Sequence, residues 1–145
     1  MKIYFAAPLF TAAERQWNAI AAAGLRKVGY HVCLPQEVQG LNDSKKVFKK
    51  NRDDIDTADA IVAIVDGPDP DSGTSWELGY GYAKGKILIA VHTDFRTAED
   101  FHEPFNLMLA VSASNLISAR YNDVEFLVSC IKNVITRSEL LRRKE

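Results

Sequence analysis

Apolar residues along this chain gather in five short continuous runs, each bounded by turn residues or by a polar stretch. Short apolar runs bounded in this way are typical of strands buried on both faces, as the strands of a parallel sheet are. We therefore expect five strands. Their sequences are KIYFA, HVCL, AIVAIV, KILIAV and SNLIS, at residues 2–6, 31–34, 60–65, 86–91 and 114–118.

The segments between these runs repeat apolar residues at intervals of three and four, the period of a helix with one buried face. The first begins after Thr11, which fits a capping box with Glu14, and it ends at Gly29. Strands that alternate with helices predict a parallel five-stranded sheet with helices on both faces, in a single-domain Rossmann-like or flavodoxin-like layered α/β fold. The other helices are expected at about 44–58, after residue 73, at 104–111 and at 123–141.

The composition suits one globular domain over residues 1–145. Hydrophobic residues make up 47% of the chain, charged residues 26%, and the net charge is -1, so no basic excess favours nucleic acid. Neither a signal peptide nor an apolar run of membrane-spanning length is present, which favours a cytoplasmic protein without a membrane partner. Cys33 and Cys130 are isolated and the histidines have no Cys or His neighbours at ligand spacing, so we expect no metal site.

Candidate chemistry concentrates in DGPDPDSGTSWELGYGYAKGK, residues 66–86, directly after the third apolar run. Loops at the carboxyl ends of strands are where open α/β sheets bind ligands. This one contains Asp71 and leads into a helix with Glu77 near its start. Because Thr74 and Glu77 fit a capping box, a structural role for Glu77 is one interpretation. The other is that the helix N-terminus keeps Glu77 ionised, so that its carboxylate can attack an electrophilic carbon.

The second helix places a polar residue on its apolar stripe. That stripe would run through Phe48, Asn51, Ile55 and Ala58, with Asp54 on the same face. A buried amide needs hydrogen-bond partners, so Asn51 is either a satisfied core amide or part of a site. The loop before this helix carries Gln39, which in isolation is typical of a solvated amide.

Four segments together resemble the nucleoside 2-deoxyribosyltransferase family over nearly the whole chain: IYFAAPLF, the strand entry Asp59-Ala60, DSGTSWELGYGYAKGK and PFNLM. The resemblance implies transfer of a 2-deoxyribosyl group between nucleobases, with retention at the anomeric carbon and a covalent glycosyl-enzyme intermediate. It implies deoxyribonucleosides and free nucleobases as partners and no cofactor.

The resemblance also implies roles for three residues of the catalytic centre. Glu77 matches the family's nucleophile. Asp71 matches the acid that contacts and protonates the departing base. Tyr4 matches the tyrosine whose hydroxyl orients the nucleophile.

The substrate-binding residues implied by the resemblance are Gln39, Asn51, Asp54, Gly73 and Asn106. Gln39 matches a base-contacting glutamine, and Gly73 belongs to the DSGT motif. Asn51 stands where several members carry an aspartate near the sugar hydroxyls, so either Asn51 or Asp54 serves the sugar. Asn106 matches an asparagine offered to a neighbouring subunit's pocket, which predicts a homo-oligomer built from dimeric units, such as a tetramer or hexamer.

Two other functions fit the same fold. One is a nucleoside or nucleotide N-glycoside hydrolase; relatives that bind a 5′-phosphate use a loop rich in Gly, Ser and Arg after the first strand. Here that loop reads AAPLFTAAER, which favours an unphosphorylated nucleoside. The other is a non-catalytic nucleoside-binding module in which Glu77 only caps its helix.

Overall fold

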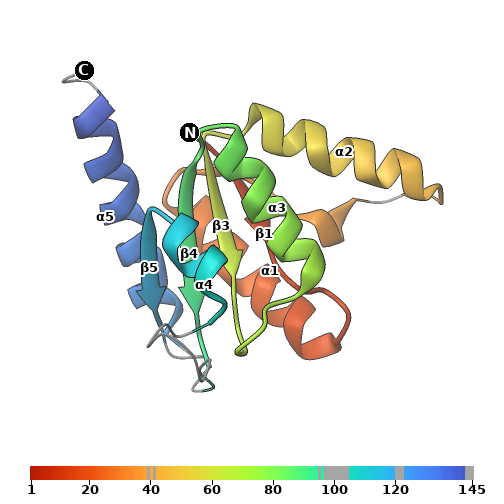
Figure 1. Cartoon of the computed structure of the whole chain (residues 1–145), viewed down its shortest axis with the longest axis horizontal. Coiled ribbons are helices and arrows are strands. Elements are labelled where there is room, and N and C mark those ends of the chain that lie inside the picture. Colours follow the sequence, from red (N-terminus) through yellow and green to blue (C-terminus); the bar gives the residue numbers. More distant parts are fainter. Residues whose placement is uncertain (39, 41, 95, 97–104, 120–122, 143–145) are drawn as a thin grey trace.

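The computed structural model describes residues 1–38, 40, 42–94, 96, 105–119 and 123–142, and it contains one parallel sheet (Figure 1). The strand order is β2-β1-β3-β4-β5, with parallel pairing throughout. This confirms the predicted five-stranded flavodoxin-like sheet, and each strand end lies within one residue of its apolar run. The strands are β1 (Lys2–Ala6), β2 (His31–Cys33), β3 (Ala60–Ile64), β4 (Ile87–His92) and β5 (Asn115–Ser118).

Helices cover both faces of the sheet (Figure 1). The chain forms α1 (Ala12–Lys27), the short 3-10 helix η1 (Pro35–Glu37), α2 (Ser44–Thr57), α3 (Ser72–Ala83), α4 (Leu107–Ser112) and α5 (Val124–Arg142). Among these helices none combines the length and the apolar character needed to cross a bilayer.

Successive side chains of a strand point to opposite faces of the sheet, so the core is divided into two layers, one on each face. Ile3 and Phe5 face one side of β1, where they pack with Leu25 of α1 and Ile131 of α5. Tyr4 faces the opposite side, in the layer that also contains Ile55 of α2, Leu78 of α3 and Phe105 before α4. The α2 and α3 layer is therefore the one that can bring helix side chains over Tyr4.

The sheet has its topological switch point at β1, which lies between β2 and β3. Connections leave β1 and β3 toward opposite faces, and this opens a crevice at the carboxyl ends of the two strands. The loop after β1 and the loop from β3 to α3 meet there. Both loops carry residues of the predicted site.

The start of α3 corrects one sequence interpretation. The cap is Asp71 and not Thr74: the Asp71 carboxylate accepts a hydrogen bond from the Thr74 backbone N–H at 2.8 Å, and the helix begins at Ser72. Glu77 therefore lies in the second turn of α3, beyond the position from which a capping-box glutamate reaches the cap. The capping-box interpretation of Glu77 was wrong, so its side chain is available for another role.

The inward stripe predicted for α2 is wrong at its first member. Asp43 caps the helix and Ile55 is fully buried, but Phe48 is 52% exposed. Figure 1 shows the reason, since the first half of α2 extends away from the sheet. Only the second half of α2 packs on the core.

Candidate active site

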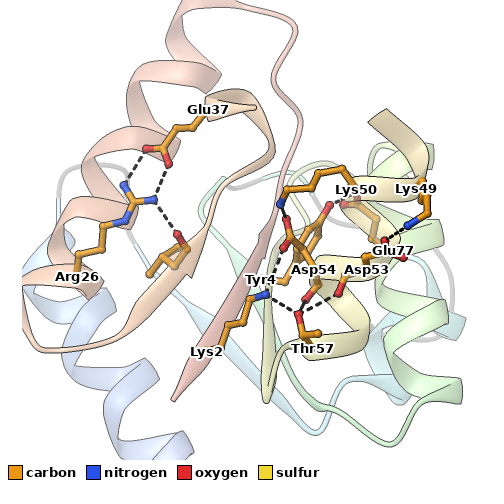
Figure 2. A network of polar contacts seen from close by, with 11 residues as sticks. Lys2, Tyr4, Arg26, Glu37, Lys49, Lys50, Asp53, Asp54, Thr57 and Glu77 are labelled. Atoms are coloured by element: carbon orange, nitrogen blue, oxygen red, sulfur yellow. Dashed lines mark hydrogen bonds and ion pairs between the residues drawn. The ribbon is translucent and has the colours of Figure 1, made fainter. Parts of the chain in front are cut away.

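A carboxylate held by a tyrosine forms the centre of the site. Tyr4 on β1 is 1% exposed, and its hydroxyl donates a hydrogen bond to Glu77 Oε1 at 2.5 Å (Figure 2). The two residues are 73 positions apart in the chain. Glu77 Oε2 has no hydrogen-bond partner within the described part of the chain. Tyr4 thus fixes one carboxylate oxygen and leaves the other available.

Burial sets the charge state of this pair. It raises the pKa of Glu77, the hydrogen bond from Tyr4 lowers it, and the negative charge of Asp71 raises it again, which gives a pKa of about 7. Burial and the adjacent Glu77 charge raise the pKa of Tyr4, so its hydroxyl stays protonated and remains a donor. Glu77 can therefore be ionised near neutral pH without losing its orientation.

Two hollows open beside Glu77, one on each side of Gly73. The first has a volume of about 250 Å³ and is lined by Phe48, Asn51, Arg52, Gly73, Trp76 and Glu77. The second has a volume of about 150 Å³ and is lined by Ala7, Leu9, Phe10, Pro35, Asp71, Gly73, Thr74 and Glu77. A ligand spanning both would lie across Glu77, the only residue besides Gly73 that both linings include.

The first hollow combines an aromatic wall with an unsatisfied polar atom. The rings of Phe48 and Trp76 lie 5.3 Å apart, and Trp76 stacks on Tyr80 at 5.1 Å. Asn51 Oδ1 is buried and accepts no hydrogen bond from the described residues. Because a buried acceptor without a partner is costly, this oxygen suits a ligand that brings a hydroxyl donor.

Asp71 lies in the second hollow with Glu77. Its Oδ2 accepts hydrogen bonds from the backbone N–H and the hydroxyl of Thr74 at 2.8 and 3.1 Å. Its Oδ1 has no such partner in the described ranges. A Cβ atom at Gly73 would lie 3.1 Å from Asp71 Oδ2, so the glycine leaves this carboxylate its space.

Asp54 lies outside both hollows. Asp54 lies in the second half of α2, where it forms ion pairs with Lys2 of β1 at 3.2 Å and with Lys50 of α2 (Figure 2). Burial would raise the pKa of Asp54, but the hydrogen bonds from Lys50 and Lys2 outweigh it and hold the pKa below its usual range. Its carboxylate is therefore ionised and already neutralised by two lysines. Gln39, which was predicted to contact the base, lies outside the described residues.

Asn106 lies at the start of α4 and does not line either hollow. Its side chain accepts from the Met108 backbone N–H at 3.0 Å and so caps α4, while its own N–H donates to the Pro68 carbonyl at 3.0 Å. A third hollow of about 510 Å³ adjoins it, between α3 and α4. This groove is lined by Gly79, Tyr82, Leu107, Met108, Leu109, Val111 and Ser112.

Three side chains at and after the ends of β3 and β4 come close enough together to suggest a metal site: Asp66, His92 and Asp94. Protein donors already occupy the carboxylates. Thr93 donates to Asp66 through its N–H and its hydroxyl, while Asp94 accepts from Gly67 and lies 3.1 Å from His92 Nε2. Within the described residues this cluster joins the loop after β3 to the segment after β4.

The family model for nucleoside 2-deoxyribosyltransferase matches residues 3–108. The chain belongs to that family. The match includes most of β1, the Asp71 to Glu77 segment and the PFNLM segment, and every residue that lines the two hollows beside Glu77 lies within it.

Three solved structures resemble this chain over most of its length and over most of their own. A conserved protein from Enterococcus faecalis V583 is 30% identical with a TM-score of 0.74, covering 92% of this chain and 98% of the other. A 2-deoxyribosyltransferase from Bacillus psychrosaccharolyticus is 28% identical with a TM-score of 0.68, covering 86% and 90%. One from Leishmania mexicana is 26% identical with a TM-score of 0.72, covering 88% and 97%.

A more distant structure shares the fold alone. The CMP N-glycosidase BcmB of Clostridium botulinum is 17% identical, with a TM-score of 0.65, and covers 91% of this chain and 98% of its own. A search of curated protein sequences found no significant match.

The sequence analysis did not identify the aromatic residues that line the two hollows beside Glu77. Trp76 and Phe10 line the two hollows, and they are 47% and 71% exposed. Large aromatic side chains at such exposure beside a carboxylate indicate a binding surface. One feature of the sequence could have indicated this role for Trp76. It directly precedes Glu77, and it does not lie on the buried side of α3.

Proposed function

We propose that this protein exchanges the nucleobase of 2′-deoxyribonucleosides through a covalent 2-deoxyribosyl-Glu77 intermediate, with retention at the anomeric carbon. One observation carries the proposal: the Tyr4 hydroxyl holds a partly buried carboxylate between two hollows, with a second carboxylate, Asp71, in one of them. Retaining glycoside chemistry needs this pair, a nucleophile and an acid on either side of the bond that breaks.

The first half-reaction forms one bond and breaks one. Glu77 Oε2 attacks C1′ while the bond from C1′ to the base nitrogen breaks, and the electron pair of that bond stays on the base. Asp71 donates a proton to the departing base. In the second half-reaction the incoming base attacks C1′, gives its proton to Asp71 and releases Glu77. Two inversions at C1′ give retention.

The neighbouring groups bind the sugar and the base. The sugar lies in the hollow between Asn51 and Trp76, where Asn51 Oδ1 accepts from a sugar hydroxyl in the role that aspartate has in other family members. The base lies in the hollow with Asp71, and Gln39 contacts it. Asp54 is paired with two lysines outside the two hollows, and it stabilises the site without contacting the substrate. Gly73 lines both hollows, and its lack of a side chain leaves room beside the Asp71 carboxylate.

The pH dependence should report Glu77. Because the attacking form is ionised, kcat/KM for base exchange should fall as the pH drops through about 7. In Tyr4→Phe the hydrogen bond that lowers the pKa of Glu77 is lost, while burial and Asp71 still raise it. We expect this acid limb to move to higher pH and the plateau rate to fall about tenfold through lost orientation. An acid limb that stays in place in Tyr4→Phe would contradict the assignment.

A second copy of this chain is the expected occupant of the groove between α3 and α4. Met108 is 76% exposed, Val111 69% and Tyr82 63%, a concentration of apolar surface typical of an interface. Asn106 adjoins this groove and reaches neither hollow of its own chain. In a homo-oligomer with dimeric units at least, Asn106 enters the neighbour's site and helps keep water from the glycosyl-enzyme.

Val111→Asp should therefore dissociate the oligomer and lower the rate of base exchange about tenfold or more, because each site loses its neighbour. Light scattering and exchange assays would measure both. Ile20→Asp is the matched control, because Ile20 is 45% exposed on α1, which covers the opposite face of the sheet. A Val111→Asp variant that is monomeric and fully active would show that the interface does not contribute to the site.

Incubation with deoxyinosine and free adenine tests the function itself. New deoxyadenosine is the expected product. Release of deoxyribose without deoxyadenosine would make the protein an N-glycoside hydrolase, and binding without turnover would make it a nucleoside-binding module.

A further inference from the structure

The loop from β3 to α3, residues 66–71, is tied to the segment after β4 by reciprocal hydrogen bonds. Thr93 donates to Asp66 through its backbone N–H and its hydroxyl, each at 2.5 Å. In the other direction, the Gly67 N–H donates to Asp94 Oδ2 at 3.1 Å. Each loop thus supplies one carboxylate to the other.

The side chain of Asp94 is enclosed by several donors. Its side chain is 2% exposed, and its Oδ2 also accepts from Arg96 Nε at 2.6 Å. Its Oδ1 accepts from the Arg96 backbone N–H at 3.0 Å and lies 3.1 Å from His92 Nε2. His92 in turn stacks on the buried ring of Phe105. A buried carboxylate surrounded by charged and backbone donors has little freedom to move.

This loop is buried at Gly67 and Pro70 but not at the two residues between them. On the side toward α1 it borders a hollow of about 480 Å³, whose wall includes Trp17 as well as Asp66, Gly67, Pro68 and Asp69. Pro68 and Asp69 are exposed. With a hollow on that side, the position of the loop depends largely on polar contacts. These are the ties to the segment after β4 and the hydrogen bond from the Asn106 N–H to the Pro68 carbonyl.

The backbone at Gly67 makes the tie to Asp94 possible. Its φ is +83°, in the left-handed region that glycine adopts without strain, and the N–H that donates to Asp94 belongs to this residue. Four residues later the chain reaches Asp71, which caps α3. A shift of the loop at Gly67 would therefore be passed to the Asp71 carboxylate.

We propose that Asp94 is a positioning residue for Asp71: by holding Gly67 it keeps the acid at the distance from the base at which it can transfer a proton. This inference rests on the proposed base exchange. Asp94 lines neither hollow beside Glu77 and so does not touch the substrate.

Asp94→Asn tests it, because the amide keeps the size of the side chain but loses the charge that holds Arg96. The assay compares two deoxyribonucleosides, one with a poor leaving base and one with an activated base that departs without a proton. We expect kcat to fall about 10- to 100-fold for the poor leaving base and to change little for the activated one, with similar KM values. Asp71→Asn with Asp94→Asn should be no slower than Asp71→Asn alone, because both remove the same step.

Two controls separate positioning from a general loss of structure. Ile135→Val, in the core under α5, lowers stability without touching the loop and should slow both substrates equally or not at all. Thr93→Val keeps the shape of the side chain and removes only its hydroxyl bond to Asp66. It repeats the test if Asp94→Asn does not fold.

Equal slowing for both bases, or losses that multiply in the double variant, would overturn the inference. Hydrogen exchange of the amides from Gly67 to Thr74 gives a reading that needs no turnover. Faster exchange in Asp94→Asn supports the tie, and unchanged exchange overturns it. A wild-type protein without base exchange would refute the proposed function, and the amide measurement would still decide whether Asp94 holds the loop.

Discussion

Glu77→Gln is expected to abolish base exchange in a protein that remains folded. The amide keeps an oxygen for the Tyr4 hydroxyl, so the one hydrogen bond of the side chain survives. An amide does not attack C1′, and removal of a nucleophile lowers kcat by about 10⁴-fold or more in enzymes of covalent mechanism. Steady-state rates measure the loss, and circular dichroism tests the fold.

The covalent bond itself can be trapped on the wild-type enzyme. A slow 2-fluoro nucleoside should leave a mass increase on the peptide that contains Glu77, and Glu77→Gln should show none. Near-normal exchange by the variant, or a label on a different residue, would show that another group carries the sugar.

Asp71→Asn is expected to slow poor leaving bases much more than activated ones. General acid catalysis contributes about 10²- to 10⁴-fold, and only a base that needs a proton to depart loses it. Asparagine caps a helix about as well as aspartate, so the hydrogen bond to Thr74 and the start of α3 should survive. Asp71→Ala would mix the two effects, because it also removes a cap that contributes about 1 kcal/mol.

A pair of deoxyribonucleosides that differ in leaving ability measures this directly. If Asp71→Asn slows both to the same degree, the side chain acts on the structure of α3 or on binding, and the proton must come from elsewhere.

Local pattern predicted the sheet well because its central strands, β1, β3 and β4, are buried on both faces. Such strands need continuous apolar runs, and each run ends where a polar or turn residue would be buried without a partner. The cap Thr11 was predicted for a similar reason, since its side chain accepts a hydrogen bond from a backbone N–H only three residues away.

The local pattern failed where two caps competed for α3. Thr74 and Glu77 have the spacing of a capping box, yet Asp71 begins the helix one turn earlier. Both Asp71 and Thr74 are residue types that cap helices, and spacing along the sequence does not tell which of them does so. The interpretation of Glu77 depended on that choice. On α2 the stripe predicted Phe48 as buried, because periodicity does not tell how far a helix extends beyond the sheet that it covers.

The amino-acid sequence alone determined the family and the layered fold, because both follow from motifs and apolar runs that are read along the chain. The tertiary structure decided which side chains meet. It brings the Tyr4 hydroxyl to Glu77, leaves Asn51 Oδ1 without a partner beside them and pairs Asp54 with two lysines. These contacts join residues on different strands and helices, and their distances depend on how α2 and α3 pack on the sheet.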